Sequence, residues 1–600
     1  MENKRRLTGK IVFWFTPAAA CLLVEILGHG GLPQIKMLFL NMVFFYMLYL
    51  VTYAVFNNEK IVYPFWNTAF FILALAEYYV LQFRDRPIML GDFLAVKTAA
   101  SVSGNYSYEI NIKIILAAAV VVALSVLAVK FPVKMREKRA RWLVVPVSVA
   151  AFTLFLTGFY QVLIKQWGIE INMWNPRSSY ESNGYAVCTF RSFAYLFEKA
   201  PDGYSVEAVR QDMETVEQNR ENAAYYWQTD TEIILENIIC IMNESFSDLS
   251  QVGDFKTDQP YLSFYNELEE NCVKGNLYMP VWGSMTSNSE YEFLTGNSIS
   301  FISAGAVPFQ IYMEAPVYGL PLTLKAQGYK TIGMHPYPAS NWNRNSAYKA
   351  MGFDEFLAEE YFLDSERIRG YVSDRGTYKK IMELTEEKEK GDKLFIFDVT
   401  MQNHGGYWEE YQAQIHVEGG DFPMAEQYLS LIRESDQALK ELLEYYENVE
   451  EPTMIIMFGD HQPSIEESFY EMLYGCSMGE VEKEDYLRRY VTPFLVWTNY
   501  ETPSEKIDKI SAMYLSNIIV ERANLLPTSY QVFLDEMYQK LPVVHPLGYY
   551  KSDGSWFTWD GWKEKEEYEQ WWKPYENFLY NNIFGRKNRI NEFFSISMQQ

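Results

Sequence analysis

The 600-residue sequence is poor in the residues that form thiolate metal sites. Its five cysteines, Cys21, Cys188, Cys240, Cys272 and Cys476, include no pair spaced as Cys-x-x-Cys. A zinc site built from thiolates is therefore not predicted. Disulfides joining Cys188 to Cys272, or Cys272 to Cys476, are open alternatives, because the spacing neither favours nor excludes either pairing.

Positive charge is also in short supply. The chain has 52 Lys and Arg against 77 Asp and Glu, which gives a net charge of −25, and nearly all of the acidic residues follow residue 165. Nucleic acid is therefore excluded as a partner, since binding a phosphate backbone requires a basic face. A chain of this length is too long for one ordinary domain, so at least two folded parts are expected.

The first part of the chain is dominated by long apolar segments. Each is close to the ~20 residues that a helix needs to cross a bilayer. Basic residues precede the first segment as they would in a signal peptide, but His29-Gly30-Gly31 is not a small-residue cleavage site, and we expect a retained helix. The segments are Ile11–Leu27, Met37–Phe56, Val62–Phe83, Ile112–Val129 and Leu143–Ile164.

The distribution of lysine and arginine predicts the orientation of these segments. Basic residues gather at positions 4–10 and in the loop 130–141. By the positive-inside rule both lie in the cytoplasm, and an odd number of spans then places everything after Ile164 outside the cell. Two acids, Glu25 and Glu77, lie inside apolar segments near their outer ends, where they either reach water or contact a substrate.

Composition divides the chain into four expected parts. Residues 1–165 form the transmembrane domain, and residues 166–230 form a linker with helices. Residues 231–535 form an extracellular catalytic domain, and residues 536–600 form a C-terminal extension packed on it. In the third part, short strand-like runs alternate with helix-like stretches, which indicates an α/β fold with a mostly parallel sheet.

Five of the strand-like runs lead into polar or reactive residues. Ligands bind at the carboxyl ends of the strands in open α/β sheets, so we expect these residues to gather in one site. The runs are Asn237–Met242 before Glu244, Asn276–Trp282 before Thr286, Tyr329–Met334 before His335, Leu394–Val399 before His404, and Met454–Phe458 before Asp460 and His461.

The residues at these strand ends suit metal-assisted nucleophilic chemistry. Glu244, Asp460 and His461 supply two carboxylates and an imidazole, which fit Mn²⁺, Mg²⁺ or Zn²⁺. Thr286 lies in a small polar turn that opens a helix. A cation and the helix N-terminus would both activate its hydroxyl as a nucleophile. Taken alone, Thr286 is better explained as a helix cap, and only the residues at the other strand ends favour a nucleophile.

Three further side chains are candidates for substrate binding. His404 could hydrogen-bond a phosphate oxygen or protonate a leaving group. Arg344 offers the planar fork that suits phosphate, although an arginine on a loop is often only solvated. Trp342, two residues earlier, could stack on a glycerol or a sugar.

These motifs resemble the lipoteichoic acid synthase group, which includes the phosphoglycerol transferases that act on cell-surface glycans. The resemblance covers the order of the whole chain and is sharpest from Asn237 to Pro463. It implies a sulfatase-like outer domain within the alkaline phosphatase superfamily. It also implies one divalent cation, commonly Mn²⁺, with Mg²⁺ or Zn²⁺ as alternatives. The tail Tyr575–Gly585 is similar to the C-terminal signature of the group.

The resemblance also implies roles for individual residues. Thr286 in Gly-Ser-Met-Thr-Ser-Asn-Ser-Glu matches the family's threonine nucleophile. The segments holding Trp342, Arg344 and His404 match those that contact glycerol phosphate. The metal ligands that match in order are Glu244, Thr286, Asp460 and His461.

The implied reaction moves glycerol phosphate from phosphatidylglycerol in the membrane, through a covalent threonine intermediate, to a glycolipid, teichoic acid or polysaccharide acceptor. Two departures qualify this expectation. The segment His335-Pro336-Tyr337-Pro338 lacks an acidic residue found in some relatives, which keeps phosphoethanolamine transfer open as an alternative. The Cys-x-Pro-x-Arg pattern of sulfatases is absent, so sulfate ester hydrolysis is not expected. A non-catalytic membrane sensor or scaffold is the remaining alternative.

Overall fold

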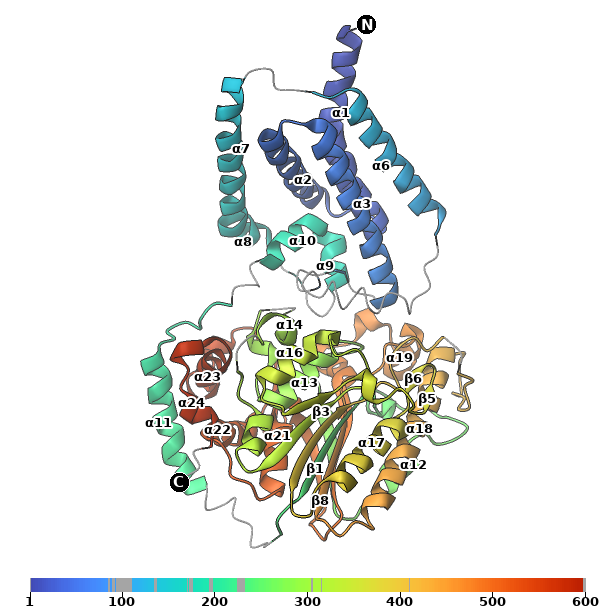
Figure 1. Cartoon of the computed structure of the whole chain (residues 1–600), viewed down its shortest axis with the longest axis vertical. Helices are drawn as coiled ribbons and strands as arrows, with labels where there is room; N and C mark the ends of the chain where they lie inside the picture. The colour runs from blue at the N-terminus through green and yellow to red at the C-terminus, as the bar shows by residue number, and fades with distance from the viewer. Residues whose placement is uncertain are drawn as a thin grey trace. The chain divides into compact units, whose positions relative to one another are not determined.

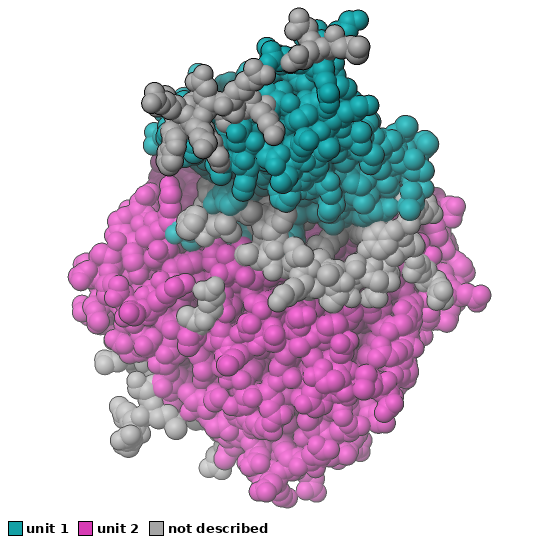
Figure 2. Space-filling view, turned by 45° about the horizontal axis from the view of Figure 1, so that its top comes forward, with its two compact units in different colours: residues 1–198, 303–306 teal, residues 199–302, 307–600 magenta. Residues whose placement is uncertain are grey.

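The computed structural model divides the chain into two compact units, which Figure 2 colours separately. The first unit holds Met1–Glu198 and Ser303–Ala306, and the second holds Lys199–Ile302 and Val307–Gln600. Each unit is described by itself below. The structure describes residues 2–84, 87–88, 92, 110–133, 138–169, 171, 176–193, 198–223, 233–303, 306–313, 316–408 and 411–596.

Among its described residues, the first unit contains five helices that are long and apolar enough to cross a membrane. They confirm the five apolar segments predicted from the sequence. Part of the basic loop, residues 134–137, lies outside the described residues, as does part of the expected linker. The helices are α1 (Glu2–Leu23) continued by η1 (Val24–Gly28), α2 (Ile35–Phe56), α3 (Glu59–Arg84), α6 (Ile112–Lys130), and α7 (Lys138–Gly158) continued by η3 (Phe159–Leu163) and α8 (Ile164–Trp167) (Figure 1).

Two acids inside these helices are buried rather than in contact with water. Glu25 and Glu77 are both fully buried, and the His29 imidazole bridges them through contacts of 3.3 Å from Nδ1 and 3.0 Å from Nε2. The other Glu25 oxygen accepts the backbone N–H of Tyr185, at the start of α10 (Tyr185–Ser192). The sequence-based alternative that these acids reach water is therefore wrong, because His29 and the backbone satisfy them inside the protein.

The second unit is built on an eight-stranded sheet in the order β10-β2-β9-β8-β1-β7-β3-β4. Only the pairings of β9 with β2 and with β8 are antiparallel, so the predicted mostly parallel sheet is confirmed. The strands are β1 (Asn237–Asn243), β2 (Cys272–Tyr278), β3 (Tyr329–Met334), β4 (Glu355–Leu357), β7 (Lys393–Val399), β8 (Thr453–Gly459), β9 (Val491–Thr498) and β10 (Glu505–Ser511).

Helices cover both faces of this sheet, which explains why every residue of β1 and β8 is buried. The helices α17 (Asp374–Glu387) and α18 (Pro423–Tyr446) lie on one side of the sheet in Figure 1, while α13 (Thr286–Thr295) and α21 (Ala512–Arg522) lie on the other. On the second side, Phe293 of α13 packs against Phe397 of β7 and Phe458 of β8, with ring centroids 5.5 and 4.8 Å away.

One predicted strand is displaced. The sequence placed a strand at Asn276–Trp282, but β2 ends at Tyr278. Pro280 has no N–H to donate to a neighbouring strand, so the ladder stops before it and the chain continues irregularly to α13. The predicted runs at the four other reactive strand ends match β1, β3, β7 and β8 to within one residue at either end.

The C-terminal part packs against the sheet domain. A small sheet of β11 (Val543–His545), β12 (Gly548–Tyr550) and β13 (Trp556–Phe557) precedes α23 (Lys573–Phe584). The Tyr575 hydroxyl of α23 accepts the backbone N–H of Ser298 and donates to the carbonyl of Gly296. All five cysteines of the chain are free thiols, so neither disulfide left open by the sequence forms.

Candidate active site

Sheet topology brings four of the predicted strand ends to one edge. The strands β8, β1, β7 and β3 are consecutive neighbours and parallel, so their carboxyl ends lie side by side. Asn243 pairs in register with Gly459, so the residues that follow them, Glu244 and Asp460, leave the sheet together. Gly459 is required there, since a Cβ would lie 1.7 Å from the Phe246 carbonyl oxygen.

Three of the predicted ligands form a compact buried cluster. Glu244, Asp460 and His461 each offer one ligand atom, and these atoms lie within 4.8 Å of one another. His461 Nε2 is 3.2 Å from Asp460 Oδ2 and 3.9 Å from Glu244 Oε1. All three side chains are almost fully buried. The structure therefore confirms that these residues, which follow β1 and β8 and lie far apart in sequence, meet.

The hydrogen bonds around the cluster leave Asp460 Oδ2 and His461 Nε2 available to bind a cation. His461 Nδ1 lies 2.9 Å from the Gln462 carbonyl, which can only accept, so Nδ1 carries a proton and Nε2 is the ring atom that faces the carboxylates. Asp460 Oδ2 is buried and accepts no hydrogen bond from any described residue. A buried carboxylate oxygen 3.2 Å from an imidazole nitrogen fits a divalent cation that both atoms would bind.

Electrostatics point the same way. Burial raises the pKa of Glu244 well above its usual range, and the neighbouring Asp460 carboxylate raises it further. Ser245 partly offsets this repulsion, because its hydroxyl donates to Glu244 Oε1 at 2.9 Å and its backbone N–H donates to Asp460 Oδ1 at 2.7 Å. Two buried carboxylates this close are costly without a positive charge, so the residues present fit a bound metal ion.

The predicted nucleophile opens α13 beside this cluster. Thr286 is the first residue of the helix and is buried, and Met285 before it has a left-handed backbone (φ 75°). One turn into the helix, the Ser289 hydroxyl donates to the carbonyl of Asp460 at 2.6 Å. Before the helix, the Gly283 N–H donates to the carbonyl of Gln462 at 3.0 Å. These two hydrogen bonds connect the loop at residues 460–462, called the metal loop below, to the chain before and after Thr286.

Arg344 lies at the start of α16 (Arg344–Ala350) but is not a free phosphate fork. Its Nε and Nη2 bind the carboxylate of Glu290 over 2.6 to 3.1 Å, and its Nη1 donates to Asn341 Oδ1 at 2.8 Å. The Tyr348 hydroxyl donates to the same carboxylate at 2.6 Å. These contacts occupy three of its five N–H groups, so any role in substrate binding falls to the two that remain.

Trp342 lies in the short helix η7 (Asn341–Asn343) after β3, and His404 lies in the loop after β7, so both follow strands whose carboxyl ends lie at the same edge of the sheet. Trp342 is partly buried and has a left-handed backbone (φ 52°), as does Asn343 (φ 60°), whose side chain donates to the Phe309 carbonyl. Left-handed conformations in large residues are costly and concentrate at functional sites. His404 is partly buried, with Nδ1 3.3 Å from the Tyr371 hydroxyl. Their predicted roles in substrate binding stay predictions.

His335 is a candidate that the sequence reasoning left without a role. It follows β3 and is buried, and its Nδ1 donates to the Val399 carbonyl at 2.8 Å. Its Nε2 is buried with no hydrogen-bond partner among the described residues. Burial, and then the positive charge of Arg344, hold the pKa of His335 well below its usual range, so the ring is neutral. In the sequence, the signal for a role of His335 was its position directly after a predicted strand.

Comparison with known proteins agrees with this architecture. Residues 236–533 match the Sulfatase family model. We call residues 236–533 the Sulfatase domain, after the family model that they match. The structure of the Streptococcus pyogenes phosphoglycerol transferase GacH, in complex with sn-glycerol-1-phosphate, is 21% identical and superposes on the chain with a TM-score of 0.56, covering 67% of this chain and all of GacH. At that identity, the likeness establishes the fold of the Sulfatase domain.

Relatives found by sequence extend the comparison beyond the Sulfatase domain. A Rhizobium meliloti (strain 1021) protein named for cyclic beta-1,2-glucan modification is 28% identical over 432 residues, which is 70% of this chain and 65% of that protein. Lipoteichoic acid synthase 2 of Bacillus subtilis (strain 168) is 25% identical over 236 residues, which is 38% of this chain and 35% of that protein. The chain therefore matches less than two thirds of the length of either relative.

Proposed function

We propose that the chain is a membrane-anchored phosphotransferase that moves glycerol phosphate from phosphatidylglycerol to a hydroxyl group of a cell-surface acceptor. The observation that carries the proposal is the start of α13 held beside a buried cluster of Glu244, Asp460 and His461. A hydroxyl nucleophile beside a cation site is the arrangement that phosphoryl transfer needs. The name of GacH, a phosphoglycerol transferase, supports phosphoglycerol as the transferred group.

The proposed reaction has two displacements at phosphorus. In the first, Thr286 Oγ1 forms a bond to phosphorus while the bond to diacylglycerol breaks, and the threonine proton passes to the departing diacylglycerol oxygen. In the second, an acceptor hydroxyl attacks phosphorus and the bond to Thr286 breaks, which returns a proton to threonine. His404 is the candidate for carrying these protons or for binding a phosphoryl oxygen.

Glu244, Asp460 and His461, together with Thr286 Oγ1, would hold the divalent cation. When bound, such an ion lowers the pKa of a coordinated hydroxyl and offsets charge on phosphoryl oxygens. The chain's own groups do the remaining work. The Ser289 hydrogen bond keeps the start of α13 against the metal loop. Arg344 lies close enough that its positive charge partly offsets the rise in the pKa of Glu244. Mn²⁺ is our proposal for the ion, with Mg²⁺ or Zn²⁺ as alternatives.

The identity of the transferred group is tested by trapping the covalent intermediate. Full-length protein in detergent is incubated with Mn²⁺ and either phosphatidylglycerol or phosphatidylethanolamine, without acceptor, and the Thr286 peptide is analysed by mass spectrometry. We expect a glycerophosphate adduct on Thr286 with phosphatidylglycerol only. A phosphoethanolamine adduct would identify the alternative transferase, and the absence of any adduct with either lipid would favour a non-catalytic sensor.

The orientation and the acceptor are further parts of the proposal. Basic residues at positions 4–10 and 130–141 favour an extracellular Sulfatase domain. Labelling Cys476, which is partly exposed, with a membrane-impermeant maleimide on intact cells tests this, because a cytoplasmic domain would not react. The name of the Rhizobium relative favours a carbohydrate hydroxyl as the acceptor, in a glycolipid, a teichoic acid or a polysaccharide.

A further inference from the structure

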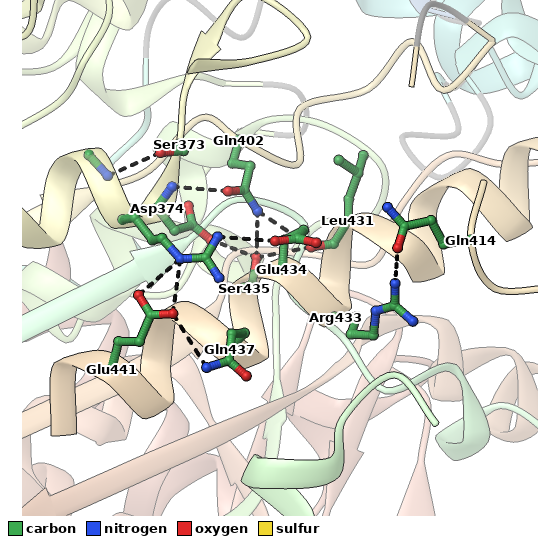
Figure 3. A network of polar contacts seen from close by, with 12 residues as sticks. Ser373, Asp374, Gln402, Gln414, Leu431, Arg433, Glu434, Ser435, Gln437 and Glu441 are labelled. Atoms are coloured by element: carbon green, nitrogen blue, oxygen red, sulfur yellow. Dashed lines mark hydrogen bonds and ion pairs between the residues drawn. The ribbon is translucent and has the colours of Figure 1, made fainter. Parts of the chain in front are cut away.

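A buried network of polar side chains adjoins the cluster of Glu244, Asp460 and His461, and the proposed reaction does not use it. Its centre is Asp374, the first residue of α17, which is fully buried. Asp374 Oδ2 accepts hydrogen bonds from Ser435 Oγ at 2.6 Å and from Asn243 Nδ2 at 2.8 Å. Figure 3 shows Asp374, Ser435 and Gln402 turned toward one another between α17 and α18.

A second set of bonds ties this centre to the loop after β7. The Asp374 N–H donates to Gln402 Oε1 at 3.1 Å, and Gln402 Nε2 donates to Ser435 Oγ at 3.1 Å. Asn403 Nδ2 donates both to Ser435 Oγ at 2.8 Å and to Asn243 Oδ1 at 3.0 Å. All five side chains are buried, so water does not compete for these bonds.

The network reaches the active site through two chain neighbours. Asn243 is the last residue of β1 and precedes the ligand Glu244, while Asn403 precedes His404. The side chains of Asn243 and Asn403 bond directly to each other, and both bond to the group that Asp374 and Ser435 form. Asp374 therefore controls how the chain after β1 sits relative to the chain after β7.

The position of Asp374 is unusual for a residue that serves only packing. Among the described residues, no ion pair joins it to a basic side chain. The next residue, Arg375, makes the ordinary connection between the same two helices. Its partly exposed guanidinium binds Glu434 at 3.0 Å and Glu441 at 2.9 Å.

We propose that Asp374 is a positioning residue whose carboxylate, acting through Asn243 and Asn403, sets the placement of the Glu244 carboxylate relative to His404. The inference rests on the proposed function for its transfer readout. Groups that orient metal ligands without touching the metal typically change metal affinity or activity by about 10- to 100-fold when they are removed. The helix N-terminus, where Asp374 lies, compensates part of its buried negative charge.

The test compares two neighbouring residues of α17 in full-length protein. Asp374→Ala removes the acceptor, Asp374→Asn keeps an acceptor without the charge, and Arg375→Gln removes the surface ion pairs between α17 and α18. Mn²⁺ affinity is measured by calorimetry without lipid, and kcat and KM for diacylglycerol release from phosphatidylglycerol are measured separately. We expect Asp374→Ala to weaken Mn²⁺ binding and lower kcat by about 10- to 100-fold each with little change in KM. Asp374→Asn should recover part of both, and Arg375→Gln should change neither.

The possible outcomes separate the two proposals. Wild-type Mn²⁺ affinity and kcat in Asp374→Ala would overturn the positioning role, as would equal losses in Arg375→Gln. If Asp374→Ala does not fold, Ser435→Ala provides the test, because it removes a neutral group from the same network. We expect this variant to lose Mn²⁺ affinity and kcat in the same way, but to a smaller extent. A wild-type protein that binds Mn²⁺ but transfers nothing would refute the proposed function, and Asp374 would then be judged on Mn²⁺ affinity alone.

Discussion

The Ser289 hydroxyl donates a hydrogen bond to the main-chain carbonyl of Asp460 over 2.6 Å. This single contact joins the helix that begins at Thr286 to the loop that carries two of the proposed metal ligands. Both groups are buried, so the bond does not compete with water. The contact explains how Thr286 is held beside the cluster of Glu244, Asp460 and His461, and a substitution at Ser289 can test it.

Ser289→Ala should slow formation of the covalent intermediate while leaving Mn²⁺ binding close to normal. The substitution leaves the Asp460 carbonyl without its buried donor, which costs about 1–3 kcal/mol. We expect that cost to appear as a looser helix start and a lower rate of diacylglycerol release, measured in a single turnover. Ser250→Ala, at an exposed position, is the control. An unchanged rate in Ser289→Ala would show that other contacts place the helix.

Thr286 itself should be indispensable. Thr286→Ala removes the nucleophilic oxygen and should lower turnover by about 10³-fold or more, without changing the thermal unfolding temperature by more than a few degrees. Thr286→Ser keeps a hydroxyl and should retain measurable activity and carry the adduct. Turnover is followed by diacylglycerol release. If Thr286→Ala keeps wild-type turnover, the nucleophile lies elsewhere and Thr286 is only the start of the helix.

The buried pair of Arg344 and Glu290 should contribute strongly to stability. Glu290→Gln leaves a buried guanidinium without its counter-charge and should reduce the free energy of unfolding by about 3–5 kcal/mol. The exposed pair of Lys330 and Glu355 is the matched comparison, and Lys330→Gln should cost about 1 kcal/mol or less. Chemical denaturation followed by tryptophan fluorescence measures both. Equal losses would contradict the burial argument.

Glu292 should make the stability of the Sulfatase domain fall with rising pH. Burial raises its pKa from 4.5 to about 8, although Ser298 and the Ile299 N–H each donate to its carboxylate. Between those two pH values the folded form holds a proton that the unfolded form has lost. The stabilisation is therefore complete below about pH 4.5, declines by up to about 1.4 kcal/mol per pH unit, and is gone above about pH 8.

Glu292→Gln tests this pH dependence, because glutamine keeps the shape and cannot ionise. Denaturation midpoints are measured from pH 5 to about pH 9 for both proteins. The variant should show a flatter profile over that window, with the difference between the two proteins growing as pH rises. Parallel profiles would mean that Glu292 does not titrate in this range. Glu564→Gln, an exposed acid in the C-terminal extension, is the control.

Metal removal should destabilise the domain in proportion to the metal affinity. A ligand that binds only the folded form stabilises it by about 2.7 kcal/mol when its free concentration is 100 times its Kd. Mn²⁺ should therefore raise the unfolding temperature of protein treated with EDTA. Asp460→Asn should abolish that rise, because it removes the charge of the carboxylate whose Oδ2 faces His461 Nε2. A full rise in the variant would remove Asp460 from the ligand set.

Much of the fold was predictable because it is encoded locally. The helices of the first unit follow from runs of apolar residues near membrane length, and β1, β3, β7 and β8 follow from short apolar runs with buried patterns. The error at β2 is also local in origin, since Pro280 ends the ladder within a run that reads as strand throughout.

The residues of the proposed metal site were predictable from the sequence, but the side-chain contacts around the site were less so. Glu244, Asp460 and His461 could be grouped because each follows a strand end, and parallel neighbours align those ends. The pairing of Arg344 with Glu290 could not, because the two lie 54 residues apart and meet only through the packing of α13 against its neighbours. His335 had the right position in sequence, but only the structure reveals its unpartnered nitrogen.

The sequence by itself determined the apolar helices, the strand runs and the kinds of ligand present, since hydrophobic period and residue chemistry are local properties. Only the tertiary structure decided the strand order β8-β1-β7-β3, the Ser289 contact that holds the start of α13 to the metal loop, and the network around Asp374. Those features depend on which distant segments pack together, and that choice is made by the burial and hydrogen bonding of the whole domain at once.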